Sequence, residues 1–197
     1  MKRPLKAPVD IDFDSAVLGG ALPAAVDDAL REAAAWRADP VRSTAALMRA
    51  RSLAPEHPAV LIALYRHHFY GHRLRAARDV ARCALVLAAQ ALGLPAVWRE
   101  VAARPLAGAR DDPATRFYLF VLKGYAYLCL RLDDPEEARS ALALLRALDP
   151  QDCVGGALLE AVRQRAGQDD DDTQPAPQPN GAAAWAGLPL ADGRTGR

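Results

Sequence analysis

The stretch that most constrains the fold is Thr115–Asp152, which reads TRFYLFVLKGYAYLCLRLDDPEEARSALALLRALDPQD. Its first half repeats large apolar side chains at three- and four-residue spacing, which predicts a helix with a broad apolar face. Asp133 and Asp134 precede Pro135, and this turn should end the helix near Leu132. The first half of the stretch therefore predicts one long helix that ends at a tight turn.

A second helix should begin directly after this turn. Asp134 is expected to be its N-cap, Pro135 suits the first helical turn, and Glu137 can complete a capping box. The apolar stripe of this helix consists of Ala138, Leu142, Leu145 and Leu148, after which Asp149-Pro150 closes the unit. A helical hairpin of about 34 residues, with small residues where the helices approach, resembles the tetratricopeptide repeat.

The composition favours an all-α fold. The chain has 197 residues, of which 51% are apolar, enough for one substantial core. Alanine and leucine dominate, β-branched residues are sparse, and no alternating strand-like run is present. We therefore expect an all-α helical-hairpin stack of about three tetratricopeptide-like units, with a C-terminal capping helix and a disordered tail.

The repeat register predicts units at about 24–57, 58–91 and 119–152, interrupted by an insertion at 92–118. Pro55 and Pro150 fit the proline that ends a unit, and Ala77 and Ala138 stand where helix packing needs a small side chain. The expected helices span about 23–38, 40–54, 59–70, 75–92 and 115–132, followed by the second helix of the hairpin. A short helix at 95–103 and a capping helix at 153–165 are also expected.

Both ends of the chain differ from the helical region in composition. Residues 1–23 are expected to form an N-terminal arm, 24–167 the helical domain, and 168–197 an acidic, proline-rich disordered tail. The tail holds five Asp and two Arg, a net charge of −3, so the total of +1 leaves +4 on residues 1–167. Its candidate docking motif is Trp185, Leu188 and Leu190. The alternatives are an inert tail and a tail that folds back on its own domain.

No catalytic or metal signature is recognisable in the sequence. Phosphate-binding loops and nucleophile elbows are absent, so we expect no enzyme activity and no cofactor. The histidine group (His57, His67, His68 and His72) is not accompanied by a carboxylate between Pro58 and Arg78, which favours packing roles over metal binding. The three cysteines form no C-x-x-C pair and indicate reduced core residues of a cytoplasmic protein. The net charge is too small for a nucleic-acid-binding protein, and no membrane helix is expected.

The tetratricopeptide resemblance implies a concave groove lined by the first helix of each unit. The positions that map to this groove are Arg66, Phe69, Tyr70, Phe120, Lys123, Tyr127 and Arg131. Cations beside aromatic rings suit an acidic or amphipathic peptide segment. The alternative is that the rings belong to the core and the cations only solubilise the helices. If the groove interpretation holds, reversing Lys123 and Arg131 to Glu should weaken partner binding without disturbing the fold.

A narrower resemblance rests on three segments of the chain. PAVLIALYRHHFYGHRLRAARDVARCALVLAAQALGLP, RFYLFVLKGYAYLCLRLDDPEEARSALALLRALDPQD and CVGGALLEAV are similar to small tetratricopeptide proteins that accompany nitrogen-fixation genes in proteobacteria. The resemblance implies a non-enzymatic accessory factor that binds a nitrogenase component during assembly, maturation or stress. The alternatives are a tetratricopeptide chaperone of a secretion system and, as an outsider, an enzyme or metal carrier that uses the histidine group.

Overall fold

The computed structural model describes residues 22–166. These residues form seven α-helices and one short 3-10 helix: α2 (Ala24–Ala35), α3 (Pro40–Leu53), α4 (Pro58–Tyr70), α5 (Leu74–Ala91), η1 (Trp98–Glu100), α6 (Pro113–Arg131), α7 (Pro135–Leu148) and α8 (Ala157–Ala166). No strand occurs within this range, so the expected all-α class is confirmed. Most of the expected arm and the whole tail, including Trp185, Leu188 and Leu190, lie outside the described residues.

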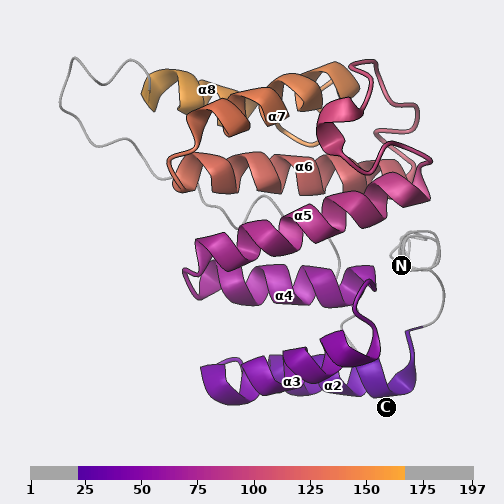
Figure 1. Cartoon of the computed structure of the whole chain (residues 1–197), viewed down its shortest axis with the longest axis vertical. Helices are drawn as coiled ribbons and strands as arrows, with labels where there is room; N and C mark the ends of the chain where they lie inside the picture. Colours follow the sequence, from indigo (N-terminus) through magenta and orange to yellow (C-terminus); the bar gives the residue numbers. More distant parts are fainter. Residues whose placement is uncertain (1–21, 167–197) are drawn as a thin grey trace, which may run out of the picture.

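The helices stack in chain order as antiparallel hairpins, which Figure 1 shows as a ladder from α2–α3 at one end to α7–α8 at the other. The hairpins are α2–α3, α4–α5 and α6–α7, and α5 packs against α6 as closely as within a hairpin. The packing of α3 against α4 is sparser, and α8 covers part of α7 at the far end. The expected helical-hairpin stack is therefore observed, with each hairpin burying its apolar face against its neighbours.

The core is built around α6. Every residue from Ala114 to Cys129 is buried except Arg116, because α5 and α7 pack on two sides of a helix that is apolar almost all round. The helix begins at Pro113, inside the range that the sequence assigned to the insertion. The reason is a local cap: the Asp112 carboxylate accepts the Thr115 N–H at 2.7 Å, and Pro113 occupies the first helical position.

The turns within the second and third hairpins have the same geometry. The Arg73 N–H donates to the His68 carbonyl at 2.8 Å, and the Asp134 N–H donates to the Cys129 carbonyl at 2.9 Å. The left-handed residues of the two turns are His72, with φ 55°, and Asp133, with φ 57°. Equivalent atoms are 61 residues apart, which is the offset between the predicted units that start at 58 and 119. The structure thus shows an internal repeat at the predicted spacing.

The unit ends and the small residues follow the same register. Ala54 and Asp149 each donate their N–H to the carbonyl four residues earlier, directly before Pro55 and Pro150. Ala77 and Ala138 are both 0% exposed, as expected for positions where two helices approach closely. In the second unit, the helix does not stop at the position of the unit-ending proline. Ala89 stands there, and α5 runs on to Ala91.

The predicted capping box at the start of α7 is wrong. The Asp134 side chain makes no capping hydrogen bond and instead forms an ion pair with Arg78 of α5 at 3.1 Å. Glu137 does not reach back to the cap; its carboxylate accepts hydrogen bonds from the Tyr125 hydroxyl and the Arg99 guanidinium. Charge-assisted bonds to neighbouring helices are stronger than neutral caps, so the tertiary partners take these carboxylates.

Two further helix boundaries also differ from expectation. Residues 95–103 contain one 3-10 turn, Trp98–Glu100, in place of the expected helix. The backbone of the insertion is tied to the third hairpin, because the Leu106 N–H donates to the Leu148 carbonyl at 2.9 Å. The last helix begins at Ala157 and not at Cys153, since the Asp152 carboxylate accepts the N–H groups of Gly156 and Ala157 at its start.

Candidate partner-binding surface

An aromatic cluster joins the C-terminal ends of α4 and α6. These two ends lie on the same side of the stack (Figure 1). The Phe69 ring is 5.7 Å from that of Tyr65, 5.5 Å from that of Tyr70 and 5.8 Å from that of Tyr127, between ring centroids. Tyr127 is 4% exposed, whereas Tyr70 is 60% exposed. The cluster therefore has a buried base that holds α4 to α6 and one large ring presented to solvent.

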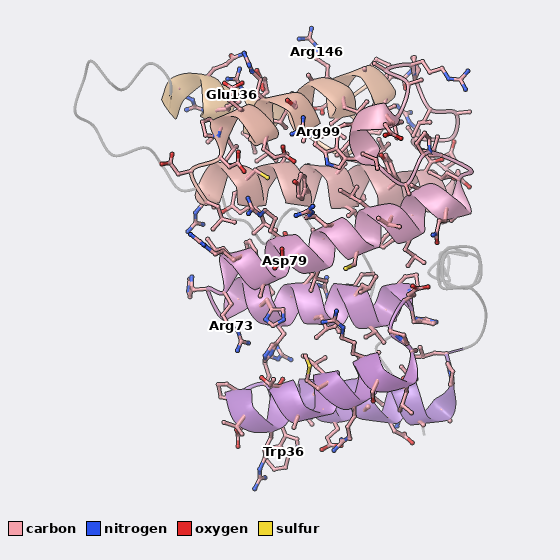
Figure 2. The ribbon with its side chains drawn as sticks, in the orientation of Figure 1. Trp36, Arg73, Asp79, Arg99, Glu136 and Arg146 are labelled. Carbon is pink, nitrogen blue, oxygen red and sulfur yellow. The ribbon has the colours of Figure 1, made fainter. Side chains whose placement is uncertain are left out.

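Three arginines lie on or directly after the two helices that carry this cluster. The Arg131 guanidinium donates to the Tyr127 hydroxyl at 2.9 Å and lies 5.9 Å from the centre of its ring. Arg66 is partly buried on α4, and this burial lowers its pKa. Arg73 lies against Gly71 at the α4–α5 turn, and Figure 2 shows its side chain directed toward the α2–α3 hairpin. We name Arg66, Phe69, Tyr70, Arg73, Tyr127 and Arg131 the aromatic–arginine surface.

Two of the seven residues expected in the groove do not belong to this surface. Phe120, Lys123 and Tyr127 are 8%, 7% and 4% exposed, so none of them forms an open groove wall as expected. Tyr127 still belongs to the aromatic–arginine surface as its buried base, whereas Phe120 and Lys123 contact other parts of the fold. The Lys123 ammonium donates to the Val154 carbonyl in the α7–α8 turn and lies 5.2 Å from the centre of the Phe120 ring. Burial lowers the pKa of Lys123, and the nearby Asp152 carboxylate opposes that shift. Lys123 is a structural cation that connects α6 to the last turn.

The other five expected residues do come together, and sequence reasoning missed a sixth. Arg73 was overlooked because it follows the turn and lies on neither apolar stripe. The repeat register is the signal that could have found it, since Arg73 is equivalent to Asp134, which forms an ion pair. The two equivalent turn positions, Arg73 and Asp134, therefore carry opposite charges. Asp134 forms an ion pair with Arg78.

The four histidines do not form one group, although the rings of His67 and His68 lie edge to face, 5.6 Å apart between centroids. His57 caps α4, where its Nδ1 accepts the Ala59 N–H at 3.3 Å, and His72 lies in the α4–α5 turn. His67 contacts the Thr44 hydroxyl through Nε2 at 2.9 Å. The Thr44 hydroxyl donates to the Pro40 carbonyl at 2.6 Å, so the imidazole must be the donor to Thr44. Among residues 22–166, no three His, Cys, Asp or Glu side chains are placed to hold a metal ion.

His67 and His68 predict a pH dependence of stability. The pKa of each lies below 6.5, chiefly through burial and then through the charge of Arg73; His67 and Arg51 add to the shift at His68. The unfolded chain therefore binds more protons as pH falls through 6.5 toward the lowered values, and stability is lost in that window. We expect a lower urea midpoint at pH 5.5 than at pH 7.5.

The matched variants for this pH experiment are on the same helix and its turn. His67→Gln/His68→Gln should reduce the difference between the two midpoints, because glutamine does not titrate. His72→Asn, in the exposed turn, should leave the difference unchanged. Equal pH dependence in the double variant and the parent chain would show that other groups control it.

Comparison with known proteins identifies one relative. No model of a known protein family matches the chain, and no solved structure matches it. Over 150 residues the chain is 38% identical to an uncharacterized 19.8 kDa protein in the nifW 5′ region of Azotobacter chroococcum mcd 1. The aligned part covers 75% of this chain and 84% of the relative. The chain belongs to the family of this protein. The gene position of this relative agrees with the nitrogen-fixation resemblance of the sequence. The tetratricopeptide assignment stays a prediction.

The family of the nifW 5′-region protein is thus represented here by a stack of helical hairpins. None of the helices within residues 22–166 is long and apolar enough to cross a membrane. The aligned length is similar to that of the whole described domain, so the relative is expected to share the stack.

Proposed function

We propose that this chain is a non-enzymatic factor that binds a protein partner in nitrogen fixation, namely a nitrogenase component during assembly, maturation or stress. The observation that carries the proposal is the 38% identical relative in the nifW 5′ region. Bacterial genes of one process commonly lie together, so this position supports a role in the same process. The proposal assigns no catalytic residue, cofactor or metal to the chain, and it places the protein in the cytoplasm with its partner.

The aromatic–arginine surface supports binding as the molecular role. Tyrosine and arginine dominate the energetics of protein interfaces, because a ring buries a large area at small entropic cost and a guanidinium makes several directed bonds. Tyr70 presents such a ring, and the cluster beneath it fixes the backbone of α4. A partner would meet a preorganised surface, which lowers the entropic cost of association.

The test is an affinity pull-down from nitrogen-fixing cells, with captured proteins identified by mass spectrometry. We expect nitrogenase subunits with the parent chain and roughly tenfold less with Tyr70→Ala, the loss typical of an interface hot spot. Trp36→Ala is the matched control, since Trp36 is another exposed ring but lies on the α2–α3 hairpin at the end of the stack, as Figure 2 shows.

The outcomes of the pull-down separate the candidate functions. Capture of nitrogenase subunits that depends on Tyr70 and not on Trp36 supports the proposal. Capture of secretion translocators would replace it with the chaperone alternative. Capture that is equal for both variants would show that the partner meets another part of the chain, and capture of neither class would contradict the proposed function.

A further inference from the structure

Arg73 and Arg131 of the aromatic–arginine surface differ from the ion-paired arginines of the fold. Elsewhere, seven arginines form ion pairs with carboxylates: Arg31, Arg42, Arg49, Arg78, Arg99, Arg139 and Arg163. Within residues 22–166, no carboxylate forms an ion pair with Arg73 or Arg131. The positive charges of these two side chains are therefore available for a carboxylate from outside the described domain.

These two arginines lie on different sides of the C-terminal end of α4. Arg73 lies on the side of α4 that faces the α2–α3 hairpin, and Arg131 lies on the side that faces α6. Tyr70, whose ring is exposed, is the last residue of α4 and lies between these two sides. The charged groups that act on the neighbouring His67 and His68 are all cationic. The end of α4 is thus a cationic region with an aromatic residue in it.

We propose that the aromatic–arginine surface binds an acidic segment of the protein partner, whose carboxylates pair with Arg73 and Arg131 and whose apolar side chain packs on Tyr70. This inference rests on the proposed function and adds the chemistry of the partner. Arginine forms two parallel bonds to a carboxylate, so two arginines fix both the position and the direction of a short acidic segment.

Helix geometry makes the two arginines decisive for this binding. The C-terminal ends of α4 and α6 carry partial negative charge, which by itself repels an acidic segment. The arginines reverse the sign of the local potential. Replacing them with glutamate therefore removes the attraction and exposes the unfavourable helix ends, so the effect should exceed the loss of two surface charges elsewhere.

Other occupants fit less well. A second copy placed symmetrically on this surface would bring like-charged arginines together. Nucleic acid is disfavoured because residues 1–167 carry only +4, the difference between the total of +1 and the −3 of residues 168–197. The acidic run of the chain itself, Asp169–Asp172, has suitable charge but is a different occupant, and the experiment distinguishes it.

The probe is a fluorescein-labelled dodecapeptide with six glutamates around one tryptophan, and its counterpart has glutamine at each glutamate. Binding to the full chain is measured by fluorescence anisotropy at low and high salt. We expect the glutamate peptide to bind, with affinity falling on the order of tenfold at high salt, and the glutamine peptide not to bind. Equal binding of both peptides, or binding insensitive to salt, would overturn the inference.

Charge-reversal variants locate the site. Arg73→Glu/Arg131→Glu should weaken binding by about tenfold or more. The matched control is Arg104→Glu/Arg146→Glu, which makes the same change in net charge at two exposed arginines; Figure 2 shows Arg146 projecting outward from α7 at the α7–α8 end of the stack. An equal loss in the control would mean that only total charge matters. If Arg131→Glu unfolds the chain, Arg131→Gln keeps a donor for the Tyr127 hydroxyl and replaces it.

Two further arms separate this inference from the proposed function. The parent chain and the Arg73→Glu/Arg131→Glu variant are compared in the pull-down. Equal capture of nitrogenase subunits would overturn the inference while the proposed function stands. Specific peptide binding without any captured nitrogenase subunit would contradict the proposed function alone. A full-length variant with Asp169–Asp172 changed to Asn should bind the peptide as the parent does, and a tenfold gain would assign the surface to the chain's own acidic run.

Discussion

Replacing Lys123 with glutamate is expected to lower the free energy of unfolding by about 3–5 kcal/mol, the usual cost of leaving a buried charge without its partner. The side chain is 7% exposed, and its ammonium donates to the Val154 carbonyl. A glutamate there would point a negative charge at that carbonyl and at the face of the Phe120 ring, both of which are electron-rich. For a domain of this size the midpoint of thermal unfolding should fall by about 10 °C.

The measurement is urea unfolding followed by circular dichroism at 222 nm, with two comparison variants. Lys123→Met keeps the apolar length of the side chain and should cost about 1–3 kcal/mol, because the Val154 carbonyl loses its donor. Arg131→Glu lies on the same helix but is exposed, and it should cost about 1 kcal/mol or less. Equal costs for the two glutamate variants would contradict the structural role of Lys123.

This result would also correct a hypothesis drawn from the repeat register. The register treats Lys123 and Arg131 as equivalent groove cations whose reversal leaves the fold intact. The structure separates them: Lys123 is buried at the α7–α8 turn, and Arg131 is exposed at the end of α6. A binding study should therefore change Arg131 together with Arg73 and leave Lys123 unchanged.

Replacing Ala138 with leucine should destabilise the domain by about 1–3 kcal/mol through overpacking. Ala138 is 0% exposed in the first half of α7, where this helix packs along α6. Three additional carbon atoms have no space at such a contact unless the two helices move apart, which would also disturb the neighbouring Glu137 contacts to Tyr125 and Arg99.

The control for this substitution is Ala143→Leu on the same helix. Ala143 is exposed, so the identical change should alter stability by no more than about 0.5 kcal/mol. Both variants would be compared by thermal and urea unfolding. A difference of less than 0.5 kcal/mol between them would show that the repeat register places the close helix contact wrongly.

Local signals in the sequence predicted most of the helical architecture. Proline with a preceding aspartate marks where α3 and α7 begin, and apolar periodicity marks the long helices on either side of the Asp133–Pro135 turn. The repeat spacing placed Ala77 and Ala138 at buried helix contacts. These features were predictable because caps, turns and amphipathic stripes depend on residues within one or two helical turns of each other.

Part of the candidate surface was predictable on the same basis. Phe69, Tyr70 and Arg131 lie at helix ends, and their residue types indicate recognition when they are grouped. Their grouping with Tyr127 follows from two hairpins packing in register, which the repeat spacing anticipated. Arg73 was not predictable from local signals, because a single arginine after a turn has no distinguishing local pattern; only the repeat register relates it to Asp134.

The tertiary structure alone decided how the polar side chains are used. Asp134 and Glu137 have the local pattern of a capping box but bond to Arg78, Tyr125 and Arg99, which come from other elements. Lys123 has the position of a groove residue but is covered by the last turn. The physical reason is the reach of long polar side chains: each selects the strongest partner brought near by packing, and that choice depends on segments far apart in sequence. The sequence by itself determined where the chain is helical and which faces are apolar, whereas the packing of the hairpins determined which charged side chains of residues 22–166 form ion pairs with one another.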